Sequence, residues 1–169
     1  MDPLEFAMQM ERDGKAFYEK AAADAPNAEV KKILLTLAEE EERHYRIFRS
    51  LREGSTVAAR REMDNRAETV TIARNLFQQM ADKGETTLYG EDARAVWKEA
   101  QKIEKKSEDM YREEAAKTTD EDRRELLGRI AEEEKNHIYL IDNMLSFMTD
   151  PQSFVDSTQY KNFMSWEGH

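Results

Sequence analysis

Two similar stretches decide the fold of this chain: residues 38–44 read AEEEERH, and residues 131–137 read AEEEKNH. Together they contain two of the three histidines among the 169 residues, each at the same place behind a run of glutamates. A pattern that occurs twice at a fixed separation indicates an internal repeat. The residues around the two stretches are therefore expected to correspond as well.

The apolar residues around each stretch follow the period of an α-helix, and a glutamate and a histidine interrupt them on the same face. In residues 27–53 this inward row is Val30, Leu34, Leu37, Glu41, His44, Phe48 and Leu51, and in residues 120–149 it is Leu127, Ile130, Glu134, His137, Ile141 and Met144. The corresponding row in residues 3–24 is Leu4, Ala7, Glu11, Gly14, Tyr18 and Ala22. In residues 91–117 it is Trp97, Ala100, Glu104, Ser107, Tyr111 and Ala115. Each of four helices therefore directs one glutamate inward.

The two halves of the chain match residue by residue. A shift of 93 positions relates Glu11 to Glu104, Tyr18 to Tyr111, Glu41 to Glu134, and His44 to His137. The chain thus consists of two copies of one helical hairpin. If the copies pack about a pseudo-twofold axis, four carboxylates and two imidazoles meet inside a bundle.

Helix start and stop signals define the expected elements. Four long helices are predicted at residues 3–24, 27–53, 91–117 and 120–149: Pro26 prevents the first from continuing, Asn27 caps the second, and Asp120 or Thr119 caps the fourth. Residues 54–90 form a long crossover in which only 67–81 has a helical pattern. We expect an all-α, antiparallel four-helix bundle over residues 1–150, with this crossover between the second and third helices.

The end of the chain is expected to behave differently from the bundle. Residues 151–169 contain several aromatic side chains, which favours packing on the bundle or on a neighbouring subunit and a small oligomer, a homodimer, over a large cage. His169, the last residue, is expected to be disordered.

Composition narrows the classes of partner and site. The formal net charge is -10 and the pI about 4.9, so nucleic acid is not an expected partner. No segment has the ~20 apolar residues of a membrane helix, and the N-terminus lacks a signal-peptide pattern, which predicts a cytoplasmic protein without a membrane partner. Because the chain has no cysteine, any metal must be held by oxygen and nitrogen.

The inward cluster has the chemistry of a metal site. Four buried carboxylates without a counter-charge repel one another and take up protons, whereas two divalent cations cancel their charge. Oxygen and imidazole ligands suit iron, manganese or zinc, and the i, i+3 spacing of Glu-x-x-His directs both side chains to one point. A lone Glu-x-x-His is more often a surface coincidence; two in phase with the core predict a metal site.

The other acidic and aromatic residues have simpler interpretations. A run of glutamates usually faces solvent, and we assign Glu39, Glu40, Glu42, Glu132 and Glu133 mostly to this class. Tyr18 and Tyr111 have two interpretations that the sequence leaves open: they are core aromatics with a satisfied hydroxyl, or they contact the ligands from beside the metal.

The doubled Glu-x-x-His motif, with the phrases MERDGKAFY at 10–18 and IEKKSEDMY at 103–111, resembles the rubrerythrin-like branch of the ferritin-like superfamily over residues 4 to about 155. The resemblance implies two iron ions, with manganese or zinc as alternatives. By this resemblance Glu11 and His44 bind one ion, Glu104 and His137 bind the other, and Glu41 and Glu134 bridge. Tyr18 and Tyr111 fall where the family often places tyrosines beside the ligands.

Two departures from the family shape the expected function. Typical rubrerythrins append a rubredoxin domain with four cysteines, which this chain lacks, so electrons are expected from a separate donor protein such as a rubredoxin. Where the family carries an extra carboxylate, this chain has Ser107 followed by Glu108, and the sequence leaves open whether either replaces it.

Three functions follow from such a site. The first is a di-iron oxidoreductase that reduces hydrogen peroxide or dioxygen. The second is a non-enzymatic iron store or metal-binding protein of the ferritin kind. The third is a bundle whose metal is structural.

Overall fold

The computed structural model describes residues 1–65, 68–84 and 89–167, and within these ranges the chain forms eight helices and no strand. Four long helices form the bundle: α1 (Pro3–Ala23), α2 (Ala28–Arg52), α5 (Glu91–Lys117) and α6 (Glu121–Thr149). The crossover contains α3 (Thr56–Asp64) and α4 (Thr69–Asp82), and the C-terminal segment contains α7 (Pro151–Val155) and α8 (Thr158–Ser165). The predicted all-α four-helix bundle is confirmed.

Three of the four long helices, α1, α2 and α6, begin at a side-chain cap. The Asp2 carboxylate accepts from the Leu4 backbone N–H with Pro3 in the first turn, and the Asn27 side chain accepts from Val30 N at 2.8 Å. Of the two candidate caps for α6, Asp120 is the one used, accepting from Arg123 N at 3.1 Å. Within the described part of the chain, no helix has the length and apolar character needed to cross a membrane.

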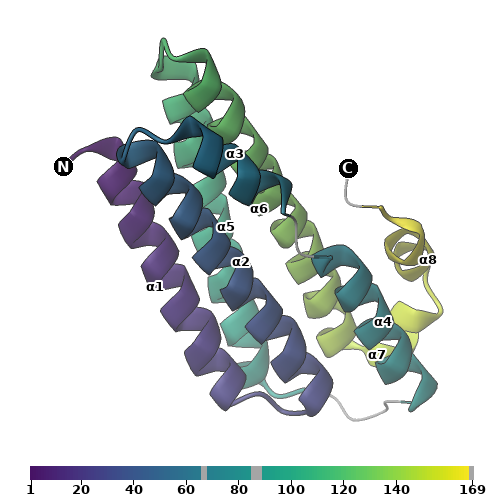
Figure 1. The fold of residues 1–169 in the computed structure, drawn as a ribbon. Helices are drawn as coiled ribbons and strands as arrows, with labels where there is room; N and C mark the ends of the chain where they lie inside the picture. The colour runs from purple at the N-terminus through teal and green to yellow at the C-terminus, as the bar shows by residue number, and fades with distance from the viewer. Residues whose placement is uncertain (66–67, 85–88, 168–169) are drawn as a thin grey trace.

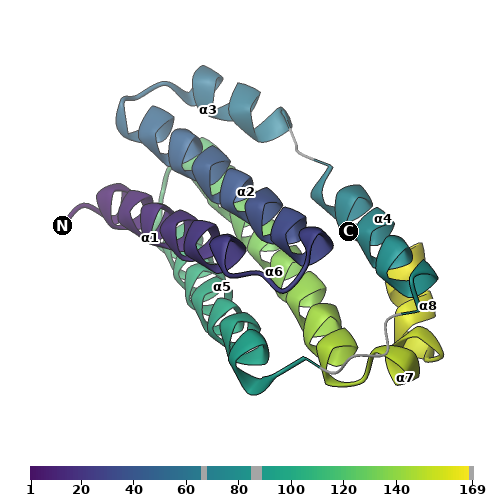
Figure 2. The same cartoon turned by 90° about the horizontal axis from the view of Figure 1, so that it is seen from below.

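The topology brings the two hairpins together with α2 and α5 parallel. α1 pairs with α2, and α5 pairs with α6 (Figure 1). From the end of α2, α3 and α4 run back along the bundle, so that α5 starts at the end where α2 also starts (Figures 1 and 2). The crossover therefore covers one side of the bundle, along α2 and α6.

One helix of the crossover was not predicted. The expectation that the crossover before residue 67 is only turn-like is wrong, since α3 begins at Thr56 and is capped by Ser55, whose hydroxyl accepts from Ala58 N at 3.3 Å. Only Ala59 and Met63 of this helix are buried, which is too few for a recognisable period. Its neighbour α4 agrees with the predicted helical stretch up to Asp82; Ala67, where that stretch was expected to begin, lies outside the described residues.

The apolar core is divided in two by the inward glutamates. One cluster includes Phe48, Tyr111 and Leu127, and the other includes Tyr18, Leu34 and Trp97. Because the glutamates lie between two apolar clusters, they are shielded from solvent from both ends of the bundle.

The C-terminal segment folds back onto its own chain. The Phe163 ring lies 4.8 Å from that of Phe77 on α4, and the Trp166 ring lies 4.5 Å from that of Tyr139 on α6. This segment therefore packs against both α4 and α6 (Figure 2). His169 lies outside the described residues.

Candidate metal centre

The structure brings the six predicted ligand residues together at the middle of the bundle. α1 and α5 each supply one glutamate, and α2 and α6 each supply a Glu-x-x-His pair. The exposed fractions are 1% for Glu11, 2% for Glu41, 0% for His44, 1% for Glu104, 0% for Glu134 and 4% for His137. Carboxylates buried to this degree need compensation by cations or by protons.

The six side chains form two overlapping groups. One contains Glu11, Glu41, His44 and Glu134, and the other contains Glu41, Glu104, Glu134 and His137; within each, one potential ligand atom per residue lies within 4.8 Å of the others. Glu41 and Glu134 belong to both groups. The geometry is therefore compatible with two neighbouring ions that share two carboxylates, although the ligand roles stay a prediction.

The atoms that face the middle of the cluster lack hydrogen-bond partners within the chain. Among the described residues, the buried unpaired atoms include Glu11 Oε2, Glu41 Oε1, His44 Nδ1, Glu104 Oε2, both carboxylate oxygens of Glu134, and His137 Nδ1. His44 Nδ1 is 2.7 Å from Glu134 Oε1 but is not aligned for a hydrogen bond. Since buried polar atoms are nearly always paired, this convergence fits a metal centre.

Two tyrosines each donate a hydrogen bond to a glutamate of the opposite hairpin, Glu104 or Glu11. The Tyr18 hydroxyl donates to Glu104 Oε1 at 2.6 Å, and the Tyr111 hydroxyl donates to Glu11 Oε1 at 2.5 Å. In each case one carboxylate oxygen is fixed by the tyrosine, which leaves the other directed at the centre of the cluster. Both hydroxyls are therefore satisfied by predicted ligand residues, and a role of the tyrosines beside a metal stays a prediction.

Burial and mutual repulsion set the protonation of the shared carboxyls. Burial, followed by the charges of Glu11 and Glu104, raises the pKa of Glu41 well above its ordinary value. Burial and the Glu104 charge likewise raise the pKa of Glu134. Burial alone would also raise the pKa of Glu104, but the nearby His137 and hydrogen bonds lower it to about 2. Without metal, burial and repulsion therefore favour the protonated forms of Glu41 and Glu134.

The pKa values of the two imidazoles are shifted in the direction opposite to that expected from burial alone. Burial would lower the pKa of His44, yet the charges of Glu134 and Glu11 raise it well above its ordinary value. Burial would also lower the pKa of His137, and the Glu104 charge raises it. The rings lie 6.0 Å apart in a stacked arrangement, with both Nδ1 atoms near the carboxylates. A cation bound there must displace protons.

Two glutamates assigned to the solvent face are in fact part of this region. Glu40 is 4% exposed and Glu133 is largely buried, so the prediction that they face solvent is wrong. Glu133 Oε2 lies 2.9 Å from His44 Nε2, and Arg43 donates to both oxygens of Glu133 at 3.1 and 2.9 Å. Despite burial, hydrogen bonds from His44 and Arg43 lower the pKa of Glu133 to about 2.

The internal repeat contains a sequence signal for Glu40 and Glu133. Glu40 and Glu133 are themselves related by the shift of 93 positions, as the ligands are. Arg43, in contrast, corresponds to Asn136 and carries no such signal.

The position of the extra family carboxylate is also settled by the geometry. Glu108 turns away from the cluster, pairing with Arg112 at 2.9 Å and with Lys105 at 3.4 Å. Ser107 is buried on the inward row and corresponds to Gly14 in the first hairpin. A Cβ atom at Gly14 would lie 2.5 Å from Glu41 Oε2, which is closer than real Cβ contacts. Neither Ser107 nor Glu108 supplies a fifth carboxylate to the cluster.

Four glutamates and two histidines, presented by four helices with a long crossover, define a ferritin-like metal-binding bundle. The sequence profile of the rubrerythrin family, described as "Rubrerythrin", matches residues 2–145. The chain belongs to the rubrerythrin family, as the resemblance of its motifs predicted. Comparisons with curated proteins and with solved structures gave no match.

Proposed function

We propose that the protein is a di-iron oxidoreductase of the rubrerythrin type, which reduces hydrogen peroxide or dioxygen with electrons from a separate protein. The observation that carries this proposal is the convergence of unpaired carboxylate oxygens and imidazole Nδ1 atoms from six buried residues. Membership of the rubrerythrin family supports iron as the metal. Manganese and zinc suit the same ligands and are tested by metal analysis.

Each residue of the cluster has a definite place in this proposal. Glu11 and His44 hold one ion, Glu104 and His137 hold the other, and Glu41 and Glu134 lie between them, as their membership of both groups supports. Two divalent cations balance four ionised carboxylates, so the cations take over the charge compensation that protons provide in the metal-free core. Iron, when bound, supplies reversible one-electron chemistry to small oxidants.

The chain's own contribution is to position the ligands and to limit water. The apolar clusters on both sides exclude solvent, which strengthens every electrostatic interaction in the centre. Burial first, and the charges of neighbouring glutamates next, raise the pKa values of Tyr18 and Tyr111 well above the ordinary value. These hydroxyls therefore keep their protons and remain hydrogen-bond donors to Glu104 and Glu11.

The electrons are proposed to come from outside these 169 residues. The 169 residues include no cysteine and so cannot hold the cysteine-ligated iron of a rubredoxin domain. A separate donor such as a rubredoxin, and a homodimer as the assembly, complete the proposal.

A second candidate is iron handling without turnover, as in a ferritin-type store. It is favoured by the position of Glu108, which pairs with Arg112 and Lys105 and so does not add a fifth carboxylate to the cluster. The size of the particle in solution separates the two assemblies: a dimer fits the enzyme, whereas a large cage fits the store.

The test is turnover by the iron-loaded protein. Protein loaded anaerobically with Fe²⁺ and supplied with a chemical reductant should consume hydrogen peroxide or dioxygen over many cycles, and the Glu134→Ala variant, which loses a shared ligand, should not. A single stoichiometric oxidation without further cycles would contradict the enzymatic proposal and favour the store.

A further inference from the structure

The two histidines of the cluster are held to different extents. His44 is fully buried, and its Nε2 lies 2.9 Å from Glu133 Oε2. Arg43 fixes that carboxylate by two hydrogen bonds and itself donates to the backbone carbonyl oxygens of Glu62 at 3.0 Å and Met63 at 2.6 Å. The His44 half of the centre is therefore sealed by a network that joins α2, α3 and α6.

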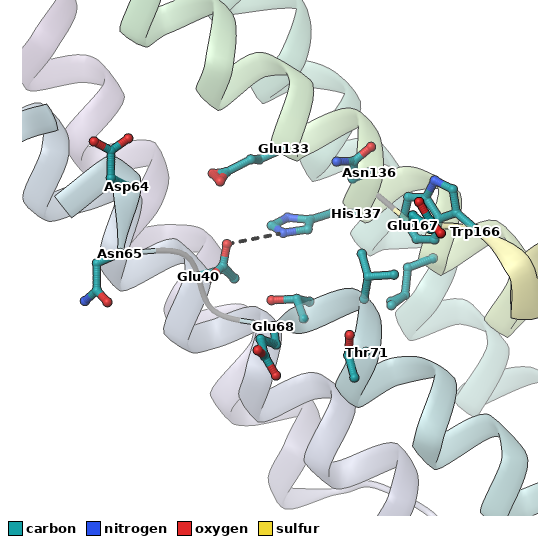
Figure 3. A pocket seen from close by; sticks show the side chains of 13 residues that line it. Glu40, Asp64, Asn65, Glu68, Thr71, Glu133, Asn136, His137, Trp166 and Glu167 are labelled. Carbon is teal, nitrogen blue, oxygen red and sulfur yellow. Dashed lines mark ion pairs between the residues drawn. The ribbon is translucent and has the colours of Figure 1, made fainter. Parts of the chain in front are cut away.

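The corresponding contact of His137 is open. Its Nε2 lies 4.0 Å from Glu40 Oε2, beyond hydrogen-bond distance, although the two side chains are directed toward each other (Figure 3). The other oxygen, Glu40 Oε1, is buried and has no hydrogen-bond partner, while the side chain is 4% exposed. A buried carboxylate oxygen without a partner indicates a place for a ligand or for water.

A cavity of about 410 Å³ reaches the centre at His137. Its walls include Glu40, Glu133, His137, Glu68 and Asp64, and residues of α2, α6, the crossover and the C-terminal segment surround it (Figure 3). His44 does not line it. The cavity thus connects the outside of the bundle with one half of the centre through a wall rich in carboxylates.

We propose that this cavity is the access route of the hydrated divalent cation, and that the Glu104–His137 position fills and empties through it while the Glu11–His44 position is closed by Arg43 and Glu133. The inference rests on the proposed two-ion centre and adds an order of loading to it. Glu40 receives the cation through its unpaired oxygen, and acidic walls raise the local concentration of cations.

The same geometry opposes a permanent third ion in the cavity. Glu40, His44 and Glu133 lie close enough to hold a metal, but the Arg43 guanidinium is 3.3 Å from Glu40 Oε2 and 2.9 Å from Glu133 Oε2. Its positive charge already balances one of the two carboxylates and repels a cation nearby. The cavity is therefore a passage to the centre.

Glu40→Gln and Glu133→Gln form a matched pair of variants, because the two residues are related by the internal repeat. The protein is loaded anaerobically with Co²⁺, whose absorption reports ligand geometry, and the ions are then removed with a chelator. For the unaltered protein we expect two ions per chain, one lost quickly and one lost slowly. Glu104→Ala, which removes a ligand of the His137 half, should abolish the fast phase.

The two glutamine variants should act on different phases. Glu40→Gln should slow uptake and the fast loss several-fold. Glu133→Gln should accelerate the slow loss by about 10-fold or more, the usual effect of removing a carboxylate that orients a ligating histidine, and should alter the Co²⁺ spectrum of that ion. Thermal unfolding confirms that both variants remain folded.

Two results would overturn the inference. If both ions leave in one phase, or if Glu40→Gln changes neither uptake nor loss, the centre has no preferred access through this cavity, while the two-ion proposal itself survives. If fewer than two ions bind the unaltered protein, the proposed function fails and this inference fails with it.

Discussion

The N-terminal hairpin, α1 and α2, and the C-terminal hairpin, α5 and α6, present equivalent glutamates and histidines to the centre, yet their next neighbours differ. Gly14 of the first hairpin corresponds to Ser107 of the second, and Arg43 corresponds to Asn136. The ligand positions agree because a charged cluster in a core tolerates little change in donor type. The surrounding positions are less constrained, so one repeated design can give two metal positions with unequal surroundings.

The largest expected effect separates shared from unshared ligands. Glu134→Ala should weaken both metal positions by about 100-fold or more, since even changes beyond the ligands cost about 10- to 100-fold. Glu104→Ala should empty only the position that uses His137. Anaerobic titration of each variant with Fe²⁺ in a calorimeter measures the number of ions bound and their affinity. If each variant lost one metal position and kept the other unchanged, Glu134 would not be shared.

A second effect tests the difference at Gly14. Gly14→Ala should displace the Glu41 carboxylate, because the new Cβ would lie 2.5 Å from Glu41 Oε2. We expect a loss of about 1 to 3 kcal/mol in the free energy of unfolding, as for overpacked cores, together with weaker metal binding. The control is Ser107→Ala, which keeps the Cβ already present. Equal effects of the two substitutions in denaturant titrations would contradict this account.

A third effect concerns pH and should be common to both halves. The raised pKa values of His44, His137, Glu41 and Glu134 favour the protonated forms of these groups in the metal-free protein, so we expect each ion to displace at least one proton. As pH falls, protons compete more strongly, so the Kd should rise about tenfold per pH unit. Glu104, with a pKa lowered to about 2, stays ionised and does not contribute.

Calorimetry in buffers of different ionisation enthalpy counts the protons released. A metal affinity that does not change between pH 6 and pH 8 would contradict the assignment of protonated histidines in the metal-free protein.

The smallest effect tests a feature that is the same in both hairpins. Tyr18→Phe and Tyr111→Phe each remove one hydroxyl that donates to a glutamate, at 2.6 and 2.5 Å respectively. Each should cost about 1 kcal/mol in the free energy of unfolding of the metal-loaded protein, by equal amounts. Thermal denaturation measures this, and a clearly larger loss in one variant would show that the hairpins differ here too.

The bundle and its six inward residues could be predicted because each is a property of one helix. The period of the apolar residues places Glu41 and His44 on the face of Leu37 and Phe48, whatever the helix packs against. The repeat then implies that the two hairpins meet. The helical period of apolar residues depends only on the geometry of a single helix, so it can be recognised in the sequence.

The features that could not be predicted depend on how separate elements pack. Glu40 immediately precedes Glu41 and points to another side of α2, which would face solvent if α3 and α6 did not pack there. From the sequence alone, Arg43 would be interpreted as a surface charge, because the backbone carbonyl oxygens that accept its hydrogen bonds belong to α3. The pairing of Tyr18 with the glutamate of the other hairpin likewise follows from the packing alone.

The most direct test of the central claim is a crystal structure of the protein loaded anaerobically with Fe²⁺, with the ions located by anomalous scattering. We predict two ions about 3.5 to 4 Å apart, one bound by Glu11 and His44, the other by Glu104 and His137, with Glu41 and Glu134 between them. A centre with fewer than two ions, or with these six side chains turned away from the metal, would contradict the account.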